Sequence, residues 1–130
     1  KMLLVHDLGE IDVGDTIVYN SDTVENKSKE ATCIERLLSI LPENQRVECR
    51  ELWFEFEAGE TAEAKYAKAV DRIPPLMHNV NDDGHSWKKH NIAKERVFAL
   101  NSKDIASGSE QIWQVVKTKL DKAVIDGLLD

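Results

Sequence analysis

The chain has 130 residues, of which 42% are hydrophobic, a size and composition that suit one globular domain with one core. Its formal net charge is -7, so its overall field repels polyanions and a nucleic-acid partner is not expected. No apolar run approaches the roughly 18 residues of a membrane span and nothing at the start resembles a signal peptide, so we expect a cytoplasmic protein without membrane contact.

The first half of the sequence predicts three helices. Residues 2–10 are expected to form the end of a buried helix, followed by a polar loop. Over residues 24–41 the apolar side chains recur at spacings of three and four, which is typical of an amphipathic helix, and Pro42 ends it. A further helix is predicted over 43–58, and Gly59 is a plausible stop because glycine readily adopts a left-handed conformation.

The second half also predicts helices. A capped helix over 61–73 should kink or unwind at the prolines 74–75, which lack a backbone N–H. Residues 79–91 are expected to form a loop, followed by a short helix over 93–100 and a longer one over 110–129. Strand patterns are almost absent, so we expect an all-α fold.

A group of acidic and imidazole side chains lies near the start of the chain. His6 and Asp7 place a nitrogen and an oxygen donor together, which a divalent cation can bind, although this dipeptide alone is a weak signal because surface histidines are common. Glu10 shares their helical face, whereas Asp12 is expected to face solvent. Asp15 follows a glycine, which would let the backbone approach a ligand and turn the carboxylate towards it.

Asp71 is the other informative acid. Its neighbours at helical spacing are apolar, and a carboxylate on such a face needs a partner. A metal ion would serve, but so would a surface salt bridge to Arg72 or Lys68. Residue patterns alone leave these two interpretations equal.

Four ordered stretches resemble the 5′-deoxyribonucleotidase-like branch of the HD-domain phosphohydrolases: residues 6–10 (HDLGE), 14–15 (GD), 51–57 (ELWFEFE) and 63–72 (EAKYAKAVDR). The resemblance covers about residues 2–80, and the ordered series is far more specific than the HD dipeptide. It implies an all-α HD-domain helical bundle.

The resemblance also implies roles for single residues. His6, Asp7 and Asp71 would bind the metal, Glu10 would activate or orient the attacking water, and Asp15 would contact the sugar of a nucleotide. Mixed imidazole and carboxylate ligands suit Mn, Co, Fe, Ni or Zn, with Mg a weaker choice.

The function implied is that of a metal-dependent phosphohydrolase that cleaves phosphate monoesters, above all (deoxy)nucleoside 5′-monophosphates. The partners expected are a small-molecule nucleotide and a second copy of the chain in a homodimer. The alternative is a non-catalytic nucleotide-binding HD module, although such a module would not need Glu10. A helical interaction protein without a site is a third possibility, in which Asp71 would only form ion pairs.

The sequence departs from the family pattern at its start. The pattern begins with a metal-binding His and a phosphate-binding Arg on earlier helices, and only five residues precede His6. We therefore expect residues 1–130 to form a single HD domain that lacks its N-terminal helices. His78, His85 and His90 are possible substitute ligands, although surface histidines are the commoner case.

Overall fold

The structure, a computed structural model, describes residues 1–14 and 24–130. These residues form helices and contain no strand, which confirms the all-α prediction. They divide into two compact units, Lys1–Glu60 and Thr61–Asp130. Among the described residues, no helix has both the length and the apolar character that crossing a bilayer requires.

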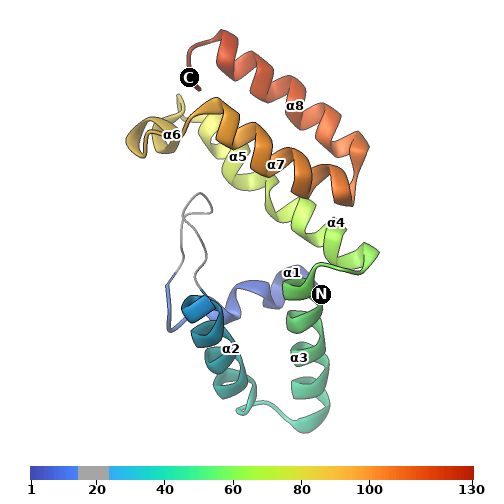
Figure 1. Cartoon of the computed structure of the whole chain (residues 1–130). Helices are drawn as coiled ribbons and strands as arrows, with labels where there is room; N and C mark the ends of the chain where they lie inside the picture. The colour runs from blue at the N-terminus through green and yellow to red at the C-terminus, as the bar shows by residue number, and fades with distance from the viewer. Residues whose placement is uncertain (15–23) are drawn as a thin grey trace. The chain divides into compact units, whose positions relative to one another are not determined.

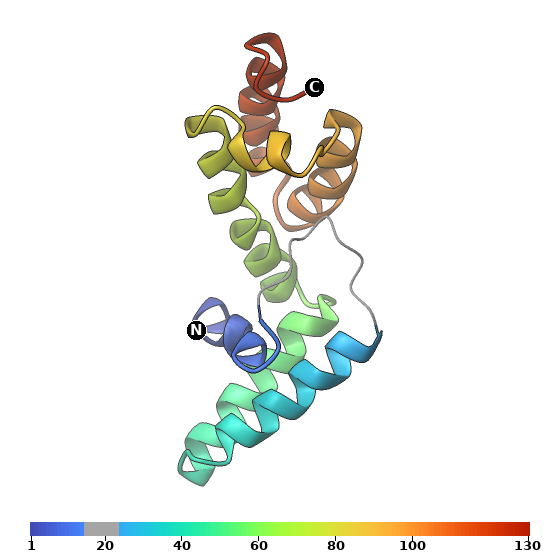
Figure 2. The ribbon, with the colours of Figure 1, turned by 90° about the vertical axis from the view of Figure 1, so that its left-hand side faces the viewer.

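The first unit is built on two long helices. Its elements are α1 (Met2–Val5), the 3₁₀ helix η1 (His6–Glu10), α2 (Val24–Leu38) and α3 (Glu43–Ala58). Helices α2 and α3 lie side by side, and η1 packs against both (Figure 1 and Figure 2). The centre of their shared core consists of Ile34, Leu38 and Trp53.

The predicted helices of this unit are confirmed, with two differences at their ends. Helix α2 ends at Leu38, before the extended backbone of Pro42. The backbone over 2–10 tightens into a 3₁₀ helix at His6. Gly59 caps α3 as predicted, with a left-handed φ of 63° and its N–H donating to the carbonyl of Glu55.

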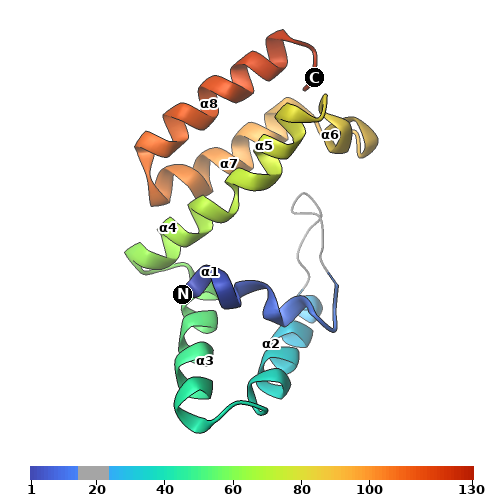
Figure 3. The same cartoon turned by 180° about the vertical axis from the view of Figure 1, so that it is seen from behind.

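The second unit is a bundle around α7. Its elements are α4 (Ala62–Asp71), α5 (Ile73–Asn81), α6 (His85–Lys89), α7 (Lys94–Gly108) and α8 (Glu110–Ile125). Helix α7 lies beside both α4 and α8 (Figure 3). Thr61 caps α4 through its hydroxyl, which accepts from the N–H of Ala64 at 3.1 Å. The helix is interrupted at Arg72, just before the two prolines, as predicted.

The loop predicted over 79–91 is wrong. Helix α5 continues to Asn81, and α6 occupies His85–Lys89. Trp87, in the middle of α6, is only 1% exposed, and its backbone N–H donates to the side-chain oxygen of Asn79 at 3.1 Å. Burial of a large aromatic side chain therefore outweighs the turn-forming composition of this segment.

The short helix predicted over 93–100 is also corrected, because α7 continues to Gly108. Polar residues of low helix propensity occupy its second half. Asn101 is nevertheless buried and donates to the carbonyl of Val97 at 2.7 Å, while Ile105 is fully buried. Packing of this face thus keeps the segment helical.

Helices α4 and α7 approach closely where Gly108 meets α4. A Cβ atom at Gly108 would lie 2.4 Å from the carbonyl oxygen of Lys65 and 2.6 Å from the Cβ of Ala69. Ala69 is itself fully buried. Small residues on both helices are therefore what permits the contact.

We predict that Gly108→Ala lowers the free energy of unfolding by about 1–3 kcal/mol, because the added methyl group collides with backbone. The control is Ser107→Ala, an exposed position on the same helix where a change within about 0.5 kcal/mol is expected. Urea unfolding of both variants measures the difference. Stabilisation by Gly108→Ala, as helix propensity alone would give, would contradict the close approach.

Candidate functional site

His6 is held in a defined orientation by a bond to the preceding helix, α1. Its side chain is 12% exposed, and its Nδ1 lies 2.9 Å from the carbonyl oxygen of Leu3. Because a carbonyl can only accept, Nδ1 must carry the hydrogen. The other ring nitrogen, Nε2, lies 2.9 Å from Oδ1 of Asp7.

Two aromatic side chains of helix α3 contact His6. The indole N–H of Trp53 donates to the carbonyl oxygen of His6 at 2.9 Å. The ring of Phe56 lies against the imidazole, with 4.8 Å between ring centroids and 57° between the planes. One helix thus fixes both the backbone and the ring of His6.

The His6–Asp7 pair fits a divalent cation. In a neutral imidazole with its hydrogen on Nδ1, Nε2 is an acceptor, and it faces a carboxylate oxygen that also only accepts. Two acceptors at this distance need a proton or a cation between them. Imidazole nitrogen and carboxylate oxygen are both ordinary ligands of such a cation, so His6 and Asp7 would hold it together.

Glu10 ends η1 and begins a tight turn. Its side chain is half-buried, and its carbonyl accepts from the N–H groups of Val13 at 3.2 Å and Gly14 at 2.6 Å. Gly14 has a φ of 88°, and no described atom lies within 4 Å of where its Cβ would be, so backbone conformation is what requires glycine here. Asp15 lies outside the described residues.

Asp71 belongs to the second unit. It is the last residue of α4 and is half-buried, while the next residue, Arg72, donates from Nε to Asp104 of α7 at 3.1 Å. Over the described residues, neither unit gathers three His, Cys, Asp or Glu side chains that could hold a metal ion. The grouping of Asp71 with His6 and Asp7 therefore stays a prediction.

The three remaining histidines lie on the surface of the second unit. His78, His85 and His90 are all exposed. Such exposure is typical of surface histidines rather than of the shielded ligands of a metal site.

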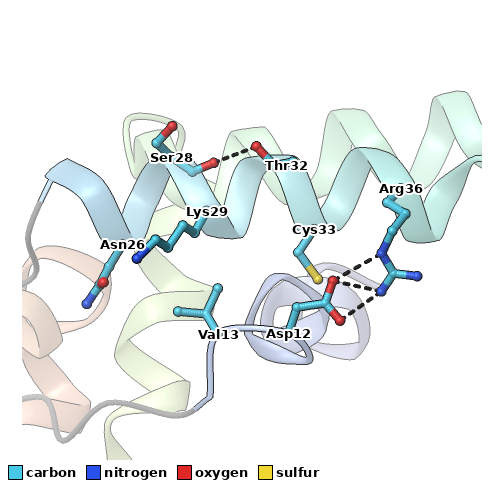
Figure 4. Close-up of a pocket in the computed structure, with 8 residues that line it drawn as sticks. All are labelled: Asp12, Val13, Asn26, Ser28, Lys29, Thr32, Cys33 and Arg36. Atoms are coloured by element: carbon cyan, nitrogen blue, oxygen red, sulfur yellow. Dashed lines mark hydrogen bonds and ion pairs between the residues drawn. The ribbon is translucent and has the colours of Figure 1, made fainter.

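A pair that the sequence did not indicate lies beside the Glu10 turn. Asp12, expected to face solvent, is half exposed, but both of its oxygens accept hydrogen bonds from Arg36 of α2 (Figure 4). These bonds, followed by one from the Cys33 thiol, hold the pKa of the Asp12 carboxyl below its ordinary value. The two residues are 24 positions apart, so no local pattern could have paired them.

A pocket of about 490 Å³ lies between the end of η1 and α2. It contains the Asp12–Arg36 pair on one side, as Figure 4 shows. Its lining residues are Asp12, Val13, Asn26, Ser28, Lys29, Thr32, Cys33 and Arg36.

Comparison with known proteins identifies relatives of this chain. Residues 1–113 match the family model of the HD domain. Over 78 residues, 59% of the chain, it is 40% identical to 5′-deoxynucleotidase HDDC2 of Xenopus laevis and 37% identical to that of Homo sapiens. These alignments cover 39% and 38% of the two relatives, so the chain spans about two fifths of their length.

A solved structure is also similar. The crystal structure of a predicted metal-dependent phosphohydrolase from Magnetospirillum magnetotacticum MS-1 matches with a TM-score of 0.89 and 38% sequence identity. The match covers 98% of this chain and 65% of that one.

We predict that His6 is the Nδ1–H tautomer in the metal-free protein. In alkaline buffer with chelator, ¹⁵N NMR should give a protonated Nδ1 and a pyridine-like Nε2, because the Leu3 carbonyl can only accept. A hydrogen on Nε2 would contradict the proposed availability of that nitrogen for a cation.

We further predict that Trp53→Phe lowers the free energy of unfolding more than Trp87→Phe does. Both tryptophans are buried, but the Trp87 indole nitrogen has no hydrogen-bond partner among the described residues, whereas that of Trp53 bonds His6. Losing the indole bond to the His6 carbonyl should cost about 0.5–1.5 kcal/mol beyond the packing loss common to both variants. Equal losses in urea unfolding would mean that the bond to His6 contributes nothing.

Proposed function

The chain belongs to the HD-domain family, and from this we propose that it is a metal-dependent phosphohydrolase of (deoxy)nucleoside 5′-monophosphates. The observation that carries the proposal is the His6–Asp7 pair, in which Nε2 of His6 lies 2.9 Å from Oδ1 of Asp7 and α3 holds the His6 backbone. Relatives named 5′-deoxynucleotidase HDDC2 support the choice of substrate.

In this proposal His6, Asp7 and Asp71 hold the divalent cation. The mixed nitrogen and oxygen ligands suit Mn, Co, Fe, Ni or Zn better than Mg. When bound, the cation supplies positive charge that polarises a phosphoryl oxygen and makes water more acidic. That charge also matters for binding, because a protein with a net charge of -7 would otherwise repel a phosphate.

Glu10 acts on the attacking water, and Asp15 contacts the sugar of the nucleotide. The Glu10 carboxylate takes or steers a proton from the water while the water oxygen bonds to phosphorus. The bond from phosphorus to the nucleoside 5′-oxygen then breaks, and the nucleoside leaves with a proton on that oxygen. The products are inorganic phosphate and a nucleoside.

We also propose that the protein works as a homodimer in the cytoplasm, with nucleotides rather than nucleic acid or membrane as partners. Cys33 and Cys49 are both free thiols, which suits a reducing compartment. Large apolar side chains at the surface, such as Leu4 at 83% and Ile125 at 84% exposed, suit contact with a second copy.

Light scattering on a sizing column measures the molar mass of the protein. A molar mass of one chain would refute the dimer.

We predict separate effects for Glu10→Gln and Asp71→Asn on phosphate release from a panel of nucleoside 5′-monophosphates. Glu10→Gln should lower turnover by about 10²–10⁴-fold and leave bound metal unchanged, because Glu10 acts on water. Asp71→Asn should lose both turnover and bound metal. Chelator should abolish phosphate release by the unmodified protein. The protein assayed should include any residues that its gene encodes before Lys1.

The control for these variants is Asp121→Asn, a half-exposed acid of α8 that pairs with Lys117 and should leave turnover unchanged. Equal metal loss in the Glu10 and Asp71 variants would make Glu10 a ligand. Nucleotide binding without any phosphate release would instead favour a non-catalytic nucleotide-binding module.

A further inference from the structure

The segment that carries Glu10 cannot hold its own position. Helix η1 has five residues, and 3₁₀ helices have poorer hydrogen-bond geometry than α-helices. Beyond it, local backbone bonds to the Glu10 carbonyl close the turn within the described part of the chain. The orientation of Glu10 must therefore come from contacts with other elements.

Besides the packing of Leu8 against the core, three contacts are spaced along the segment from Leu8 to Asp12. At its start the Cys33 thiol of α2 lies 3.6 Å from the Leu8 carbonyl oxygen. In its middle, Gly9 is so close to α3 that an added Cβ would lie 3.0 Å from Cζ2 of Trp53. At its end Asp12 is bound by Arg36, one turn after Cys33 on α2.

The contact at Asp12 controls direction as well as distance. The Arg36 Nε donates to Oδ2 at 3.0 Å, and its Nη2 donates to Oδ1 at 2.9 Å and to Oδ2 at 2.8 Å. A planar guanidinium bound to a carboxylate in this two-pronged way fixes the plane of the carboxylate, which a lysine could not do. Figure 4 shows the pair spanning from the end of η1 to α2.

The same pair adds little to stability. The Arg36 and Asp12 side chains are 54% and 49% exposed, and exposed ion pairs contribute little to the free energy of unfolding. The lowered pKa of Asp12 keeps its carboxylate ionised, so the pair stays formed in mildly acidic solution. Its effect on orientation can therefore be separated from any effect on folding.

We propose that Arg36 is a positioning residue for the reaction: by holding Asp12 against α2, it orients the turn that begins at Glu10 and thereby aims the Glu10 carboxylate at the attacking water. This inference rests on the proposed function, in which Glu10 acts on that water. Arg36 itself touches neither water nor substrate in this role.

The test compares Arg36→Met and Arg36→Lys in the full chain, with phosphate release from a deoxynucleoside 5′-monophosphate as the assay. Arg36→Met should lower kcat by about 10–100-fold, because a small misplacement of a reacting group is costly, with KM, bound metal and Tm nearly unchanged. Arg36→Lys should recover part of kcat, because it keeps the charge but loses the two-pronged geometry.

Arg50→Met is a matched control. Arg50 of α3 donates to Glu35 of α2 at 2.6 Å, and the two side chains are 51% and 47% exposed, almost as in the Arg36 pair. Within the described residues, neither Arg50 nor Glu35 forms a hydrogen bond with the Glu10 turn, so kcat should stay unchanged. The double variant Asp12→Asn/Arg36→Met should be no worse than Arg36→Met, because both changes remove one interaction.

Amide hydrogen exchange gives a readout that needs no turnover. Protection of the Val13 and Gly14 N–H groups, which donate to Glu10, should fall in Arg36→Met and not in Arg50→Met. If the unmodified protein releases no phosphate, the proposed function fails, and exchange alone then decides whether Arg36 orders the turn. Equal kcat and equal protection in the Arg36 and Arg50 variants would overturn the positioning role.

Discussion

The positions of His6 and Asp7 depend on one interaction, the packing and hydrogen bonding of the Trp53 indole against their segment. Its N–H bonds the His6 carbonyl, its ring borders Gly9, and it completes a core with Ile34 and Leu38. A five-residue 3₁₀ helix has little stability of its own, so its place is set by the helix that it leans on. The orientation of His6 is therefore a property of α3 as much as of the HD dipeptide.

The second unit holds Asp71 by a different physical means. Helix α4 packs against α7 through small side chains, and at Gly108 the helices come closer than any Cβ would allow. At the end of α4 the Arg72–Asp104 pair, about one quarter exposed on each side, joins the same two helices. Partly buried pairs of this kind are costly to break, because the remaining charge loses its partner. Asp71 is thus carried on closely packed helices, whereas His6 and Asp7 are carried on a short segment held by side chains.

Apolar periodicity and capping residues predicted much of this fold. The helix over 43–58, its glycine cap and the cap at Thr61 all appear where the pattern placed them, because these signals are local. The errors at 79–91 and 93–100 arose where local composition opposed packing. Trp87 and Asn101 are buried once the unit is folded, and a window of neighbouring residues contains no information on that burial.

The sequence by itself determined that the chain is helical, where most helices start and stop, and which acids and histidines resemble an HD-domain site. Tertiary structure alone decided how those residues are supported: Trp53 reaches His6 across 47 positions, and Arg36 reaches Asp12 across 24. Periodicity reports which face of a helix is apolar, since that depends on neighbours three and four residues away. The partner that a polar side chain meets depends instead on how separate helices pack, and no spacing within one helix encodes it.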